Sequence, residues 1–173
     1  MKILKLFKYV YISVMSVIIL VLVSFLLASL FSKKGYTEIF GYSFFEVQSY
    51  SMYPELDKGD LIVVKKRKSS EYKKEMVVTY WLPTDTIPTT HKIVSIENDT
   101  VITKGINPNT NNGNDLPFDI EYIIGEVVVV WSGYSNVKQF ITNPVGIIII
   151  ILSGFLLIEG FNYIEDKYTK KEE

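Results

Sequence analysis

Apolar residues divide the chain into three parts, with a long apolar run near each end and a mixed middle. The first run, 9–31, contains no charged residue. As a helix rising ~1.5 Å per residue it would extend about 34 Å, enough for a hydrocarbon core about 30 Å thick. We therefore predict an N-terminal segment at 1–8 and a transmembrane anchor at 9–31.

A cleavable signal peptide is the alternative for this first run. The apolar region of a signal peptide is usually ~7–15 residues long and ends at a small-residue cleavage site. Ala28 and Ser29 fit such a site, but the run is longer than that region. The pattern favours an anchor that stays attached.

The second apolar run, 144–161, is shorter, contains internal glycines and includes Glu159 near its end. A buried core helix is the alternative here. However, the isoleucines at 147–151 and the apolar residues at 155–158 leave no polar face, which amphipathic packing would need. We predict a second membrane-spanning helix at 144–161 and a charged tail at 162–173.

Lysines flank the outer ends of both runs. By the positive-inside rule they predict cytoplasmic termini and an extracytoplasmic middle in a cell membrane. Two further lysines that directly follow the first run oppose this orientation, and whether the second run crosses the bilayer decides between a multi-pass and a single-pass protein. The outer lysines are Lys2, Lys5, Lys8, Lys167, Lys170 and Lys171, and the opposing pair is Lys33 and Lys34.

The middle of the chain, 32–143, has the pattern of short β-strands. Its apolar stretches are rich in β-branched residues and separated by turn residues, and Asn98-Asp99 between two of them predicts a tight hairpin. We predict a mainly β fold, in which a small antiparallel β domain joins the two membrane helices. The predicted strands are 61–66, 75–82, 91–97, 100–104 and 123–131.

Composition excludes several kinds of site. The chain has no cysteine, so a disulfide framework, a thiolate nucleophile and a cysteine-ligated metal are ruled out. It has a single histidine, which excludes a histidine-rich metal site. Its net charge is −1, without the basic stripe that nucleic-acid binding favours. We expect no nucleic-acid partner, no metal and no organic cofactor.

The segment 49–56, S-Y-S-M-Y-P-E-L, is the most informative stretch. Ser51 follows an apolar strand and precedes a proline-bearing turn, an arrangement that can present a hydroxyl outward. The segment Lys58-Gly59-Asp60 and another strand come next. On composition alone Ser51 is a loop serine, as most serines are.

Four segments together resemble the conserved boxes of signal peptidase I. Ser49–Leu56 with Lys58-Gly59-Asp60 resembles the nucleophile box, and 90–94, T-H-K-I-V, resembles the second box of the endoplasmic-reticulum and archaeal type. The segments 103–105, T-K-G, and 124–128, I-G-E-V-V, resemble the third and fourth boxes. The four occur in the family's order behind an apolar run and cover most of the chain.

Two positions depart from the family's pattern. Tyr50 stands where the family usually has glycine, which predicts either an ordinary backbone or strain at that position. Ile106 stands where the family commonly has aspartate after T-K-G. The second departure removes one candidate for the acidic member of a catalytic triad.

The resemblance implies a serine endopeptidase with a small β fold and an extended substrate groove. Ser51 would be the nucleophile, and the Ser51 N–H with the Ser49 hydroxyl would form the oxyanion hole. His91 would be the general base, since an imidazole accepts a proton near neutral pH whereas Lys92 would first have to be held uncharged. Neighbouring strand residues face opposite sides, so one of the two can face Ser51.

The acidic member of the site is the least determined. Asp115 resembles the family's second acidic position, and Asp119 is the alternative. An aspartate in an asparagine-rich loop is also a common turn residue, so both positions stay open, as does a Ser-His dyad.

The implied partners are the lipid bilayer and exported precursor proteins whose signal peptides end in small residues, while partner subunits are undetermined. A protease of the same fold that serves a narrower set of exported proteins is one alternative. A non-catalytic, membrane-anchored β module that acts as a scaffold or assembly factor is another, and it draws on the departures at Tyr50 and Ile106.

Overall fold

A computed structural model describes residues 2–31, 35–110 and 113–169, with the backbone alone at some helical positions. The chain separates into two compact units, which we call the helical unit (Met1–Phe31 and Val137–Glu173) and the sheet unit (Ser32–Asn136). The predictions made for Lys33, Lys34, Lys170 and Lys171 lie outside the described residues.

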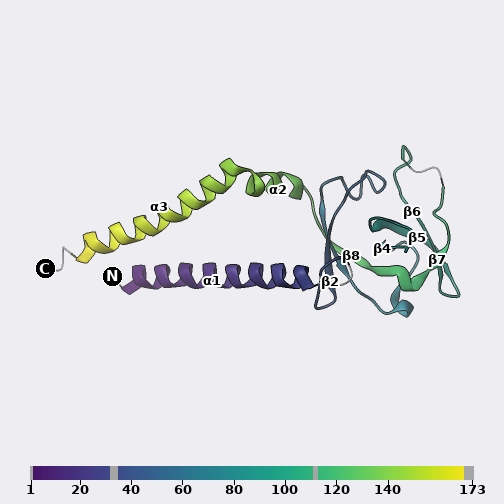
Figure 1. Ribbon diagram of the computed structural model, residues 1–173, viewed down its shortest axis with the longest axis horizontal. Coiled ribbons are helices and arrows are strands. Elements are labelled where there is room, and N and C mark those ends of the chain that lie inside the picture. Colours follow the sequence, from purple (N-terminus) through teal and green to yellow (C-terminus); the bar gives the residue numbers. More distant parts are fainter. Residues whose placement is uncertain (1, 32–34, 111–112, 170–173) are drawn as a thin grey trace. The chain divides into compact units, whose positions relative to one another are not determined.

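Figure 1 shows three α-helices and one β-sheet. The α-helices are α1 (Lys2–Phe31), α2 (Tyr134–Thr142) and α3 (Pro144–Thr169), and two short 3-10 helices are η1 (Ser69–Glu71) and η2 (Ile120–Tyr122). The strands are β1 (Glu38–Ile39), β2 (Tyr42–Glu46), β3 (Leu61–Lys65), β4 (Val77–Tyr80), β5 (Thr89–Glu97), β6 (Thr100–Lys104), β7 (Phe118–Asp119) and β8 (Ile123–Trp131).

The eight strands form one antiparallel sheet in the order β1-β2-β3-β8-β4-β5-β6-β7. The last strand of the chain, β8, lies between β3 and β4 and so joins the two halves of the sheet. Gly125 lets β8 pass close to β3, because a Cβ there would lie 2.4 Å from the Lys65 carbonyl oxygen. The register between β3 and β8 shifts at Val63 and Val64.

The fold-class prediction is supported in part: the antiparallel sheet is present, but the protein is less strongly β than expected. The sheet is antiparallel as expected, but the protein is mixed α/β, since α1 has 30 residues, α2 has 9 and α3 has 26. Helix α1 begins at Lys2 and so includes the lysines before the predicted anchor, because lysine is a good helix former. Helix α2 lies within the predicted β domain, and α3 continues beyond residue 161.

The predicted strands 61–66, 75–82, 91–97, 100–104 and 123–131 correspond to β3, β4, β5, β6 and β8. The hairpin prediction is confirmed, because Asn98 and Asp99 connect β5 to β6 with φ angles of 46° and 67°. Positive φ at both central residues is characteristic of a type I′ turn, whose twist matches that of paired strands.

Two apolar clusters form the core of the sheet unit. The first surrounds Tyr80 and Ile93, and the second surrounds Met52 and Ile62. Met52 is 1% exposed, so the loop that carries Ser51 is held by a buried side chain directly after the serine. Burying a methionine of this size contributes about 2 kcal/mol.

In the helical unit, α1 and α3 contact each other near the N-terminus of one and the C-terminus of the other. Lys8 Nζ donates to Asn162 Oδ1 at 3.0 Å, and the rings of Tyr11 and Phe161 are 6.1 Å apart. The two helices therefore run antiparallel, with the start of α1 and the end of α3 at the same end of this unit (Figure 1).

Among the described residues, one helical stretch, Pro144–Ile164, is long and apolar enough to cross a membrane. It has 21 residues, about 31 Å of helix, and 6% of it is buried. In α1 the apolar stretch within the described residues, Leu6–Val21, is shorter.

Candidate active site

Ser51 lies in a short loop between β2 and β3. The loop is closed at its base by two hydrogen bonds, from the Val47 N–H to the Asp60 carbonyl at 2.9 Å and from the Gly59 N–H to the Val47 carbonyl at 2.8 Å. Within the loop the Leu56 N–H donates to the Met52 carbonyl at 2.9 Å, while the Met52 side chain enters the core. The turn geometry predicted after the serine is therefore observed, with Gly59 at a φ of 88°.

Asn107 holds the Ser51 loop from the other side. Its N–H donates to the Ser51 carbonyl at 2.9 Å, and its side-chain Nδ2 donates to the Tyr50 carbonyl at 2.7 Å. Asn107 is buried, at 6% exposure. Two hydrogen bonds from one buried residue fix the backbone of the serine, and this residue was not singled out in the sequence.

His91 and Asp115 are joined by a short side-chain contact. Nδ1 of His91 lies 2.6 Å from Oδ2 of Asp115. His91 belongs to β5 and is buried. Asp115 lies near the end of the loop that follows β6, where the chain runs back beside that strand and the Asp115 N–H donates to the Thr103 carbonyl at 2.8 Å. Of the two aspartates left open by the sequence, Asp115 is the one beside His91.

Two more donors converge on the same carboxylate oxygen. The Thr103 hydroxyl donates to Asp115 Oδ2 at 2.6 Å and the Tyr80 hydroxyl donates to it at 3.3 Å. Thr103 belongs to the T-K-G segment, and Tyr80 shares a face of β4 with the buried Val78. Val78 pairs with His91 across β4 and β5, and Tyr80 lies two residues further along the same face of β4. The alternation of side chains could therefore have indicated from the sequence that Tyr80 lies near His91.

Hydrogen bonds determine the charge of this carboxylate. Burial raises the pKa of Asp115, but the hydrogen bonds from His91 and Thr103, the positive charge of protonated His91 and the hydrogen bond from Tyr80 together hold that pKa below its usual value. Burial first, and the negative charge of Asp115 as well, raise the pKa of Tyr80 to about 12. Near neutral pH, Asp115 is therefore a carboxylate and Tyr80 a neutral donor.

The protonation of Asp115 decides the tautomer of His91. An ionised carboxylate only accepts hydrogen bonds, so Nδ1 of His91 must carry the proton. The neutral imidazole then has its lone pair on Nε2. This is the arrangement that a general base needs, with one ring nitrogen held by a carboxylate and the other able to accept a proton.

A groove brings Ser51 and His91 together. It has a volume of about 530 Å³ and receives Ser49 and Ser51 from the loop and His91 from β5. Its walls come from β2 and from the segment before β5, which are far apart in the strand order, so the sheet curls around it. The apolar lining consists of Phe44, Phe45, Val47, Met52, Leu56, Ile62, Ile87 and Pro88.

In this structure the hydroxyl of Ser51 is 3.1 Å from the hydroxyl of Ser49. Within the described residues no hydrogen bond connects Ser51 to His91, nor does the Ser51 N–H donate to any group. Catalytic hydrogen bonds are often long or absent before a substrate binds. The site therefore brings a serine, an unused N–H and an oriented imidazole to one groove.

Lys92, the alternative base, faces away from this groove. It forms an ion pair with Glu55 and borders a different cavity, with Lys104 and Ile106 among its neighbours. The alternation of side chains along β5 places His91 and Lys92 on opposite faces, as the sequence predicted.

The two departures from the family's pattern have simple structural outcomes. Tyr50 is half exposed and is not among the described residues with a positive φ, so no left-handed strain arises from the absence of glycine there. Ile106 packs against the core cluster around Met52, so its side chain joins the apolar core rather than the polar contacts of His91.

Asp119, the other candidate acid, has a local role. Its carboxylate accepts a hydrogen bond from the Glu121 N–H at 2.9 Å, which caps η2. Such capping is a common use of aspartate at the start of a helical turn. In the described part of the chain it forms no hydrogen bond or ion pair with His91 or Ser51.

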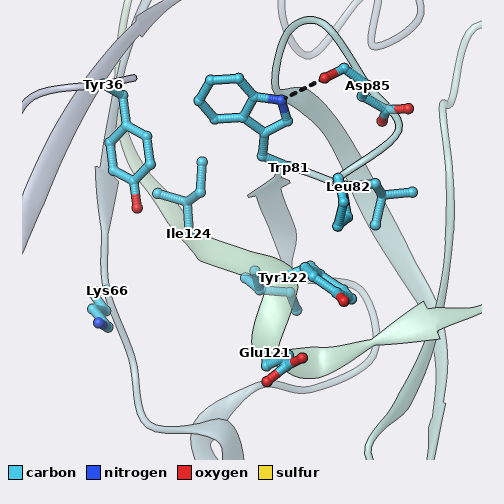
Figure 2. A pocket seen from close by; sticks show the side chains of 10 residues that line it. Tyr36, Lys66, Trp81, Leu82, Asp85, Glu121, Tyr122 and Ile124 are labelled. Carbon is cyan, nitrogen blue, oxygen red and sulfur yellow. Dashed lines mark hydrogen bonds between the residues drawn. The ribbon is translucent and has the colours of Figure 1, made fainter. Parts of the chain in front are cut away.

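Figure 2 shows another cavity of the sheet unit, also of about 530 Å³. Trp81 borders it and donates from Nε1 to the Asp85 carbonyl at 3.0 Å, and the ring of Tyr36 lies beside the indole. None of the four residues predicted for the catalytic site lines this cavity, which is bordered by Tyr36, Lys66, Trp81, Leu82, Pro83, Asp85, Glu121, Tyr122, Ile123 and Ile124.

Within the described residues, no group of three or more histidine, aspartate or glutamate side chains is arranged to hold a metal ion. A comparison of the sequence with protein-family models finds no matching family, and a comparison with curated protein sequences finds no significant match.

Proposed function

We propose that this chain is a membrane-bound serine endopeptidase of the signal peptidase I type, which removes signal peptides from exported precursors. The observation that carries the proposal is the site itself. Ser51 and His91 line one groove, and Asp115 accepts from His91 Nδ1 at 2.6 Å, which leaves Nε2 for the serine proton. The resemblance of four segments to the boxes of that family supports the same residues.

In the proposed reaction the Ser51 oxygen attacks the scissile carbonyl carbon while its proton passes to His91 Nε2. The negative charge that develops on the carbonyl oxygen is stabilised by the Ser51 N–H and the Ser49 hydroxyl. The imidazolium then protonates the departing amine. Water releases the acyl group from Ser51 in a second round through the same base, and no metal or organic cofactor takes part.

The Asp115 carboxylate stabilises the imidazolium that forms during each half of the reaction. Thr103 and Tyr80 hold that carboxylate in place, since both donate to the same oxygen that His91 contacts. An extended substrate segment fits the groove between β2 and the segment before β5, where backbone pairing would give affinity and the apolar walls would select side chains.

The membrane part of the proposal rests on the two long helices. A stretch of α3 has the length and composition of a membrane span, and its 6% burial differs from that of a core helix. Helix α1 runs antiparallel to it, and lysines lie toward the shared end. Both termini are then cytoplasmic and the sheet unit extracytoplasmic, where exported precursors emerge.

The deciding experiment uses the full chain, purified in detergent, with a secretory precursor as substrate. Wild type is compared with Ser51→Ala, and Ser70→Ala serves as the matched control because Ser70 is exposed in η1 and does not line the groove. We expect wild type and Ser70→Ala to cleave after the signal peptide and Ser51→Ala to lose at least ~10³-fold in rate.

Equal cleavage by wild type and Ser51→Ala would refute Ser51 as the nucleophile. If no variant cleaves, the same proteins are tested in membranes against a panel of precursors. Continued failure there would favour the non-catalytic β module.

A further inference from the structure

Helix α2 separates its apolar and polar residues onto two faces. At 100° per residue, Tyr134, Val137, Phe140 and Ile141 fall within an arc of about 120°. The polar residues Ser135, Asn136, Lys138, Gln139 and Thr142 occupy the rest of the circumference. Three of the apolar side chains are exposed, with values of 40% for Val137, 47% for Phe140 and 46% for Ile141.

The residues between α2 and α3 determine where the first helix ends and the second begins. Pro144 has no N–H and disfavours helical geometry at Asn143, the residue before it, so α2 ends at Thr142. The Asn143 side chain then caps α3 by accepting a hydrogen bond from the Val145 N–H at 2.8 Å. Gly146 allows the close approach, because a Cβ there would lie 1.8 Å from the Phe140 carbonyl oxygen. Figure 1 shows the chain changing direction between α2 and α3.

The position of α2 in the chain places it at the edge of the predicted span. The candidate span begins at Pro144, and the exposed apolar residues Val137, Phe140 and Ile141 precede it by three to seven positions. At ~1.5 Å per residue, these side chains lie within about 10 Å along the chain from the start of the span. The headgroup region adds about 5–8 Å on each side of the hydrocarbon, so Phe140 and Ile141, about 6 Å or less from the start of the span, fall within it.

A second observation lies at the other end of α2. Trp131 and Tyr134 have ring centroids 5.6 Å apart, and Trp131 is 51% exposed. Exposed tryptophan and tyrosine side chains are typical of the boundary between hydrocarbon and water, because each has an apolar ring and a polar group. Both ends of α2 thus have features of a membrane interface.

We propose that α2 is an interfacial helix, which lies in the headgroup region with Val137, Phe140 and Ile141 toward the lipid. This rests on the proposed crossing of the membrane by α3. The start of α2 is also attached to the base of the Ser51 loop, since the Ser135 N–H donates to the Gly59 carbonyl at 3.0 Å.

Because the chain has no cysteine, single-cysteine variants can be labelled without further substitutions. Val137→Cys, Phe140→Cys and Ile141→Cys test the apolar face, and Asn136→Cys and Gln139→Cys are the matched controls on the polar face. Ile150→Cys reports on α3. Each full-length variant is labelled with a nitroxide, reconstituted in vesicles of phosphatidylcholine and phosphatidylglycerol, and measured for accessibility to oxygen and to a water-soluble nickel complex.

We expect the three apolar positions to favour oxygen over nickel by at least about threefold relative to the two polar positions, and Ile150→Cys to be shielded from nickel. Equal nickel access on both faces of α2 would overturn the inference, as would an apolar face shielded from both reagents, which would mean that protein covers it. If Ile150→Cys is also open to nickel, the proposed membrane crossing fails too. Precursor cleavage by the same variants tests the proposed enzyme activity separately.

Discussion

The sheet unit contains two cavities of equal volume, about 530 Å³ each, which differ in chemistry. In the groove that holds Ser51 and His91, the polar groups are coupled, because one carboxylate oxygen of Asp115 accepts from three side chains. In the cavity beside Trp81 (Figure 2), Lys66, Asp85 and Glu121 border the space without an ion pair among them. Volume does not distinguish the two cavities, whereas convergent titratable groups make the groove the candidate site.

The largest difference is expected between two neighbours on β5. His91→Ala removes the only imidazole of the chain and should lower kcat for precursor cleavage by at least ~10³-fold. Lys92→Ala should lower it by less than about threefold, because Lys92 borders a different cavity and pairs with Glu55. Single-turnover cleavage assays measure both. A larger loss with Lys92→Ala would make lysine the base and contradict the assignment.

The next largest effect concerns the two aspartates. Asp115→Asn keeps the shape of the side chain but removes the charge that orients and stabilises imidazolium, so a loss of ~10²- to 10⁴-fold in kcat is expected. Asp119→Asn should change kcat by less than about twofold, since Asp119 caps η2. Unchanged turnover in Asp115→Asn would leave a Ser-His dyad in place of a triad.

Some elements of the fold could be predicted from the sequence and others could not. Strands β3, β6 and β8 and the Asn98-Asp99 hairpin were predictable, because β-branched runs and turn residues are local signals. Helix α2 was missed, since nine residues of mixed polarity give too short a pattern for a helix to be recognised.

The choice between Asp115 and Asp119 was not predictable either, because it depends on how a long loop returns along β6. The pairing of this loop with β6 is a tertiary contact, and no short sequence pattern indicates it. The contributions of Tyr80 and Asn107 were missed for the same reason, as each acts across a distance of many residues in the chain.

A smaller effect is expected on stability as the pH falls. Because the folded pKa of Asp115 lies below its unfolded value of ~3.9, its ionised form adds stability above that value, and this contribution is lost as the pH falls through the folded pKa. Wild type should therefore lose more unfolding free energy between pH 7 and pH 3 than Asp115→Asn loses. Urea unfolding of both proteins in detergent measures the difference. Identical losses would show that the hydrogen bonds to Asp115 do not favour its ionised form.

The smallest effect on turnover is expected in the other cavity. Trp81→Phe removes the hydrogen bond to the Asp85 carbonyl, worth about 1 kcal/mol, and loosens the contact with Tyr36, whose ring centroid is 6.3 Å away. Stability should fall by about 1–2 kcal/mol, while kcat and KM for the precursor stay within about twofold of wild type. The conservative variant Trp81→Tyr should behave in the same way. A selective rise in KM, without loss of stability, would mean that substrate reaches this cavity as well, and that the coupled groove is only part of the binding site.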